Sequence, residues 1–189
     1  MEPFKLHTIE TAPEGAKTLL SEVEQQMKFI PNLYAVMADS PQVIRAYSEM
    51  GKLFGQTSFS QVEKNIIWLV ISRTNGCHYC TAIHSMVAKM SHVSEDIIDA
   101  VRTYRPIHDR KLQALRQFTV IMVEKRGLAS EQEVNDFLLA GYTKTQILEL
   151  IVGIAQKTIS NYVNHVAGTP LDEPVKPFAW QIEKSDPVF

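Results

Sequence analysis

The sequence predicts an all-α fold of six to eight helices followed by an extended C-terminal tail. Helix-capping boxes, a serine or threonine with a glutamate or glutamine three residues later, recur at residues 60–63, 130–133 and 143–146. Apolar residues recur at helical spacing, and no segment alternates with the period of two that is typical of a β-strand. After Gly168 the chain holds four prolines, which favours an extended tail that lies on the surface or wraps a neighbour.

Length and composition favour one globular domain over residues 1–189. The net charge of −2 gives no basic surface for nucleic acid or an anionic membrane. The longest apolar run, residues 66–71, is far shorter than the about 20 residues of a membrane helix. The N-terminus shows no apolar run of a signal peptide. We therefore expect a cytoplasmic protein without nucleic-acid or membrane partners.

The N-terminal part is predicted to form three helices. Apolar residues at helical spacing follow Pro13 and indicate a helix over residues 14–27. A shorter helical piece follows at 31–38. Ser40 caps the next helix, in which Pro41 takes the first position and which extends to about residue 54.

A central buried helix is predicted over residues 60–74. Its run Ile66–Ile71 alone would also suit a buried strand, but the capping box, the length and the helical surroundings favour a helix. Because the helix is apolar nearly all round, we expect it at the centre of the fold. Gly76 follows its end, where glycine tolerates the left-handed conformation of a helix C-terminus.

The remaining helices follow in close succession. Ser94 and Asp109 are predicted caps, and glycines follow three of the helices at the positions where a helix stops. The predicted ranges are 77–90, 95–104, 109–126, 130–141 and 143–166.

Both cysteines of the chain stand in a Cys-x-x-Cys motif, Cys77 and Cys80, where the 77–90 helix begins. Free backbone N–H groups and the helix dipole favour a thiolate at such a position. His84 lies four residues after Cys80, on the same helical face. Its imidazole can accept the thiol proton or return a proton to a leaving oxygen. In a reducing compartment this arrangement indicates redox or metal chemistry.

The cysteine pair has two other possible interpretations. Both could be inert core residues. Alternatively, Cys77, Cys80 and His84 could bind a metal ion with His165 or Glu63 as fourth ligand, although structural zinc usually needs a second motif of this kind. Redox chemistry is the preferred interpretation, and neither a metal nor a cofactor is expected.

Residues 63–84 resemble the signature of the AhpD-like alkylhydroperoxidase/carboxymuconolactone decarboxylase family, an upstream glutamate followed by Cys-x-x-Cys-x-x-x-His on two consecutive helices. Residues 29–33, 38–41 and 161–165 resemble the longer, peroxidase-related members of this family. The resemblance covers about residues 25–172. It implies a single AhpD-like domain that assembles as a homo-oligomer, a trimer or a hexamer.

The resemblance also implies thiol-dependent reduction of hydroperoxides by a dithiol reductant such as a lipoyl protein. It makes Cys80 the peroxidatic cysteine, Cys77 the resolving cysteine, and His84 the member of a proton relay with upstream Glu63. Helix-dipole reasoning alone favours Cys77 as the acidic thiol, because it lies nearer the helix start. We follow the family assignment, since His84 and Glu63 are better placed to activate Cys80.

Two positions depart from the family pattern. The relay glutamate of the best-characterised branch corresponds to Asn65, whereas Glu63 is also the third position of a capping box. Tyr79 stands where that branch has a histidine before the second cysteine. Glu63 is thus either a relay acid or a helix cap. The alternative functions are a non-redox enzyme of the decarboxylase type, or a redox-sensing or metal-binding oligomer.

Overall fold

The computed structural model describes residues 3–181, which are helical and contain no β-strand, so the all-α prediction is confirmed. This part of the chain has more helices than the six to eight expected, because the short segments also form helices of their own. The α-helices are α1 (Glu14–Met27), α2 (Asn32–Met37), α3 (Pro41–Gly55), α4 (Gln61–Thr74), α5 (His78–Met90), α6 (Glu95–Arg102), α7 (Arg110–Glu124), α8 (Glu131–Leu139) and α9 (Lys144–Ala167), and a 3-10 helix, η1, spans Glu173–Phe178.

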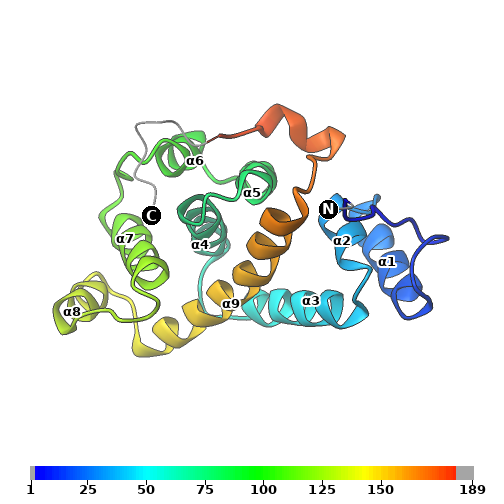
Figure 1. Ribbon diagram of the computed structural model, residues 1–189. Coiled ribbons are helices and arrows are strands. Elements are labelled where there is room, and N and C mark those ends of the chain that lie inside the picture. Colours follow the sequence, from blue (N-terminus) through cyan, green and yellow to red (C-terminus); the bar gives the residue numbers. More distant parts are fainter. Residues whose placement is uncertain (1–2, 182–189) are drawn as a thin grey trace.

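Helix α4 lies at the centre of the fold, as its apolar sequence predicts. It contacts α5, α6, α7 and α9, and its apolar residues from Ile66 to Ile71 are buried except for the half-buried Trp68. In Figure 1, α4 and α5 lie side by side, and the long α9 crosses the molecule beside them. The two helices that carry the predicted motif are therefore both internal.

The turn between α4 and α5 sets the position of the cysteines. Gly76 adopts a left-handed φ of 66° directly after the α4 cap. The N–H of Cys77 donates to the carbonyl of Ser72 at 2.9 Å, and the N–H of Gly76 donates to that of Arg73. These two bonds form a Schellman motif, which reverses the chain sharply because glycine tolerates this conformation. Helix α5 thus starts at Cys77 and packs back along α4.

Two hydrophobic clusters form the interior. The first surrounds α4 with residues of α6, α7 and α8, and includes the stacked rings of Phe118, Phe137 and Tyr142. The second joins α1, α2 and α3 to the start of α5 and contains Cys77 and Cys80. In Figure 1, α1–α3 lie on one side of α9 and α4–α8 on the other. The cysteines therefore lie where the two halves meet.

The C-terminal segment differs in part from the extended tail that was expected. Residues Glu173–Phe178 form η1, which packs on α5 of the same chain (Figure 1). Prolines at 174 and 177 fix φ near the value of a helical turn, which suits a short 3-10 helix. Trp180 is buried. Residues 182–189 of the predicted tail lie outside the described residues.

Between residues 3 and 181, no single helix is both long and apolar enough to cross a membrane. The bent pair α8 and α9, which meet at 108°, satisfies the length and composition criteria jointly.

Candidate active site around the two cysteines

The two cysteines occupy the first turn of α5, where the sequence places them. Cys77 is the N-cap, and its Sγ accepts the backbone N–H of Cys80 at 3.3 Å. Both thiols are free, and their exposed fractions are 1% for Cys77 and 0% for Cys80. The pair is thus present in reduced form and is shielded from solvent.

Helix α9 supplies polar groups to both sulfur atoms. The Asn164 side-chain Nδ2 donates to Cys80 Sγ at 3.1 Å and lies 3.9 Å from Cys77 Sγ. Ser160 Oγ lies 3.9 Å from Cys80 Sγ. These residues and Asn161 lie on one face of α9 and are buried, because residues three and four positions apart project from the same side of a helix. One helix therefore lines the sulfur pair with polar side chains, of which Asn164 is the donor to Cys80 Sγ.

The two thiols differ in acidity. Burial raises the pKa of Cys80, but the hydrogen bond with Cys77, the charge of Lys157 and the amides of Asn164 and Asn161 outweigh it and lower the pKa to about 5. The pKa of Cys77 is raised, first by the hydrogen bond to Cys80 and then by burial. Cys80 is thus the thiolate of the pair, which the helix dipole alone would not have predicted.

His84 contacts a buried lysine. Lys157 Nζ lies 2.7 Å from His84 Nε2, and because an ammonium can only donate, Nε2 is the acceptor and the proton of the neutral ring lies on Nδ1. The ring stacks on Trp68, with centroids 5.5 Å apart. Burial, and then the charge of Lys157, hold the pKa of His84 well below its usual value. His84 is therefore a neutral imidazole.

Lys157 is a site residue that the sequence reasoning missed. Its side chain is 1% exposed, and none of the ion pairs with carboxylates between residues 3 and 181 includes it. It lies on the buried face of α9 that also carries Leu150, Gly153 and Asn164. A lysine on the inner face of a long helix is unusual, and this feature of the sequence could have identified Lys157 as a candidate site residue.

Glu63 lies in the first turn of α4, and the cysteine turn follows the other end of that helix. Its Oε2 accepts the N–H of Ser60 at 2.7 Å, completing the predicted capping box, and its Oε1 lies 3.9 Å from Lys111 Nζ. Glu63 and Thr74 are separated by roughly 16 Å along the helix axis. No contact among the described residues joins Glu63 to His84. The cap is observed, and the relay role remains a prediction.

Two further residues that the sequence singled out have other positions. His165 is exposed and lines a cavity of about 700 Å³ between α7 and α9, on the outer side of α9. Tyr79 is buried, and its hydroxyl donates to Asp172 Oδ2 in the C-terminal segment. Within residues 3–181, no group of three or more histidine, cysteine, aspartate or glutamate side chains could hold a metal ion.

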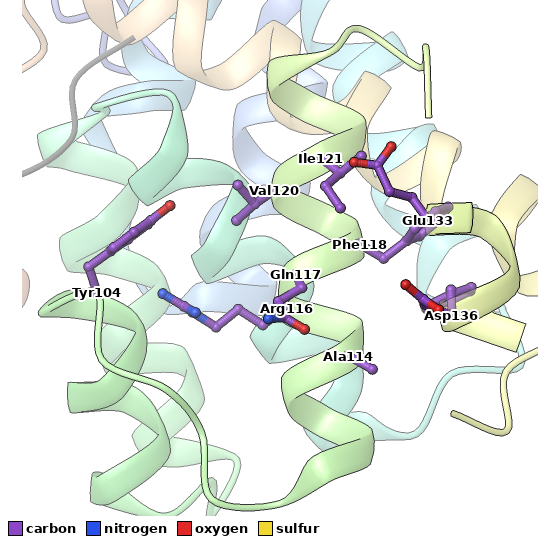
Figure 2. Close-up of a pocket in the computed structure, with 10 residues that line it drawn as sticks. Tyr104, Ala114, Arg116, Gln117, Phe118, Val120, Ile121, Glu133 and Asp136 are labelled. Carbon is purple, nitrogen blue, oxygen red and sulfur yellow. The ribbon is translucent and has the colours of Figure 1, made fainter. Parts of the chain in front are cut away.

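A separate cavity of about 450 Å³ lies between α7 and α8, away from the thiols (Figure 2). In Figure 2 the guanidinium of Arg116 reaches toward Tyr104, whereas Glu133 and Asp136 lie at the opposite side. The cavity combines opposite charges, and neither cysteine lines it. It is therefore not part of the thiol site.

Comparisons with known proteins agree with this architecture. The carboxymuconolactone decarboxylase family matches residues 41–119, a region that holds both cysteines and His84 but not Lys157 or Asn164. No curated protein matches the chain.

Solved structures show the same fold at low sequence identity. A peroxidase-related protein with an alkylhydroperoxidase AhpD core from Ralstonia eutropha JMP134 superposes with a TM-score of 0.80 at 17% identity, covering 93% of this chain and 96% of that one. The debrominase Bmp8 in complex with 2,3,4-tribromopyrrole has a TM-score of 0.77 at 16% identity over 94% and 96% of the two chains. A putative antioxidant defence protein AhpD from Agrobacterium tumefaciens has a TM-score of 0.61 at 17% identity, over 72% and 96%.

The sequence signature, the helical fold and the family match agree with one another. Residues 41–119 therefore match the carboxymuconolactone decarboxylase family, and the fold of the chain is that of solved AhpD-like structures.

Proposed function

We propose that this protein is a thiol-dependent hydroperoxide reductase of the cytoplasm, with Cys80 as the peroxidatic and Cys77 as the resolving cysteine. The observation that carries the proposal is the opposite acidity of two neighbouring thiols. Cys80, with its pKa lowered to about 5, is a thiolate at neutral pH, whereas Cys77 keeps its proton. A thiolate beside a protonated thiol is the pair that peroxide reduction through a disulfide requires.

The reaction would proceed in three balanced steps. The Cys80 thiolate attacks one oxygen of ROOH, the O–O bond breaks, and Cys80 becomes a sulfenic acid while RO⁻ takes a proton from the site. The Cys77 thiol then attacks the sulfenic sulfur, which forms the disulfide and releases water. A dithiol reductant opens the disulfide by exchange and is itself oxidised to a disulfide. The net change is ROOH plus a dithiol to ROH, water and the oxidised reductant.

Burial of the thiols restricts the reactants. Because the exposed fraction of Cys80 is 0%, a peroxide reaches it only when the packing between α1–α3 and the start of α5 opens. We therefore expect hydrogen peroxide and small alkyl hydroperoxides to react faster than bulky ones. A slender dithiol such as a lipoyl arm suits the same route.

We also propose a homo-oligomer, a trimer or a hexamer. Large apolar side chains are exposed along one side of α9, and burying them against further copies would remove this surface from water. They are Leu148, Ile151, Tyr162 and Val166.

The test is steady-state reduction of hydrogen peroxide, an alkyl hydroperoxide and cumene hydroperoxide against a panel of dithiols. Cys80→Ser should abolish turnover and prevent sulfenic acid formation. Cys77→Ser should still form one sulfenic acid per chain but fail to turn over. Turnover that survives in Cys80→Ser and is lost in Cys77→Ser would reverse the two roles. Undiminished hydroperoxide reduction in the double variant would show that neither thiol takes part and would overturn the proposal.

Reductive dehalogenation is a second candidate, favoured by the structural likeness to a debrominase over 94% of this chain. The same dithiol could convert an aryl bromide to the arene, with release of bromide and a proton and formation of the Cys77–Cys80 disulfide. Bromide release from a brominated pyrrole, measured beside peroxide turnover, separates the two. Stoichiometric zinc in the reduced protein, without a peroxide-induced disulfide, would support a metal-binding or redox-sensing role instead.

A further inference from the structure

Within residues 3–181, the buried ammonium of Lys157 has no carboxylate partner. Burying an unpaired charge is costly, so a buried lysine usually finds a compensating anion or several acceptors. Lys64 of α4 is also buried, and its ammonium donates to the carbonyl of Gly55 at 2.6 Å. This contact lies at the ends of α3 and α9 that are distant from the thiols. Among the described residues, the ammonium of Lys157 forms a hydrogen bond only with the imidazole of His84. Its charge must be balanced by another group.

The titratable groups that face Lys157 come from three elements besides its own. Tyr34 of α2 interacts with the charge of Lys157 and Tyr47 of α3 with that of Cys80, and burial raises the pKa of both phenols, so they are neutral. Cys77 and Cys80 belong to the start of α5, and the charge of Lys157 favours the thiolate form of each. Within this group only Cys80 has a lowered pKa, and the charge of Lys157 is one of the causes. Cys80 is therefore the member of the group whose charge can balance that of Lys157.

The imidazole of His84 completes the arrangement without adding charge. Its Nε2 accepts one hydrogen of the ammonium, and stacking on Trp68 fixes the ring. Trp68 is held in turn by a hydrogen bond from its Nε1 to Gln156 on α9 at 2.8 Å. The ammonium is thus oriented by a rigid acceptor, and its other two hydrogens have no acceptor among the described residues.

From this geometry we propose that Lys157 is the proton store of the site, which gives its proton to the leaving oxygen of the hydroperoxide and recovers a proton from Cys80. The proposal rests on the proposed function and deepens it. In it, a buried lysine of α9 has the proton-relay role that the family resemblance assigns to a glutamate of α4.

The cycle balances in atoms and charge. The Cys80 thiolate takes the OH of ROOH, and RO⁻ receives a proton from the Lys157 ammonium, which leaves ROH and a neutral amine. The Cys77 thiol and the Cys80 sulfenic acid then condense to the disulfide and water. When the dithiol reductant has opened the disulfide, both cysteines are thiols, and Cys80 passes its proton to the amine. The pair returns to thiolate and ammonium.

This cycle explains why a charged lysine is tolerated in the interior. The site is neutral overall when both members are charged and again when both are uncharged, so no isolated charge is buried at any stage. Neutral His84 cannot replace the ammonium as a cationic acid. Glu63 contacts none of these side chains in the part of the chain that the structure describes, and it is not needed for the cycle.

Three lysine variants test the proposal through the titration of Cys80, measured as thiolate absorbance in a Cys77→Ser background. Lys157→Met should move the midpoint upward by about 1–3 pH units, because an opposite charge near a thiol has an effect of that size. Lys157→Arg keeps the charge but cannot release a proton, so the midpoint should stay within one unit. The control Lys64→Met removes a buried lysine away from the thiols and should leave the midpoint unchanged. An unchanged midpoint in Lys157→Met would overturn the proposal.

Measurements of turnover separate the effect of the Lys157 charge from the transfer of its proton. With both cysteines present, Lys157→Arg should lose about 100-fold or more in hydroperoxide turnover, within the range of general acid catalysis, despite its retained thiolate. The loss should be larger for peroxides with poorer leaving groups. Wild-type turnover in Lys157→Arg would show that only the charge of Lys157 matters and would overturn its role as acid.

A third readout does not depend on peroxide turnover. The side-chain carbon shift of Lys157 reports its charge, and it should change from ammonium to amine when diamide converts the dithiol to the disulfide. An ammonium in both states would overturn the proposal. If wild-type protein reduced no hydroperoxide and yet showed this change, the proposed function would fail while the thiol–lysine proton exchange would stand.

Discussion

The two hydrophobic clusters of this protein differ in what they bury. In the cluster around α4, the rings of Phe118, Phe137 and Tyr142 stack at centroid distances of 4.3 and 4.5 Å. At the thiols, by contrast, α9 buries polar and charged side chains beside Cys80. They are Lys157, Ser160, Asn161 and Asn164.

This difference separates stability from reactivity. Closely packed rings gain dispersion and remove apolar surface from water, which stabilises the fold. Burying polar and charged side chains costs free energy, so their concentration beside the sulfur atoms calls for a functional reason. The first cluster supports the scaffold, and the second holds the reactive sulfur. Changes in one should therefore leave the other nearly intact.

The largest expected effect belongs to the aromatic cluster. Phe137→Ala should lower the free energy of unfolding by about 3–5 kcal/mol, because the ring is 1% exposed and packed on both faces. Urea unfolding measures this loss. The pH titration of Cys80 in the folded variant should match that of the wild type. A shift of that titration by a full pH unit would show that the two clusters are not independent.

The pH dependence of turnover sharpens the description of the thiol site. The pKa of Cys80 is lowered to about 5, so the thiolate persists at neutral pH and is lost as the pH falls through that value. Turnover should therefore fall about tenfold for each unit below pH 5. The rate of Cys80 alkylation should follow the same curve. An acid limb near pH 8 or 9 for both rates would contradict the stabilised thiolate.

A smaller effect is expected at the amide that serves the sulfur pair. Asn164→Ala removes the donor 3.1 Å from Cys80 Sγ and should raise the pKa of Cys80 by about one unit, or about 1.4 kcal/mol. Thiolate absorbance against pH measures the shift. Thr158→Ala is the matched control, because its hydroxyl bonds only to the carbonyl of Ile154 on the same helix. Equal shifts in both variants would point to a general loosening of α9.

The smallest effect is expected at Glu63. Glu63→Gln preserves a side chain that can complete the capping box and should change the free energy of unfolding by less than about 0.5 kcal/mol. Hydroperoxide turnover should stay within about twofold of the wild type, since the observed contacts of Glu63 are with Ser60 and Lys111. A loss of 100-fold in turnover at unchanged stability would instead restore Glu63 as the relay acid.

Local features of the fold could be predicted from the sequence, because their hydrogen bonds join residues three or four positions apart. The capping boxes, the buried α4 and the placement of Cys77 at a helix start are of this kind. Lys157 and Asn164 could not be assigned, since they meet the cysteines only through packing across more than 70 residues of chain. Glu63 illustrates both kinds of inference, because its local capping box is observed, whereas its relay role would need a contact across the fold and stays a prediction.

Both tryptophans of the chain lie against a histidine of the cysteine motif. Trp68 stacks on His84, and Trp180 lies 5.6 Å from His78, whose Nδ1 also contacts the Trp180 carbonyl at 3.1 Å. The emission of an indole is sensitive to a neighbouring imidazole and to small changes in packing. We therefore expect the intrinsic fluorescence of this protein to report, without any label, whether its two cysteines are thiols or joined as a disulfide.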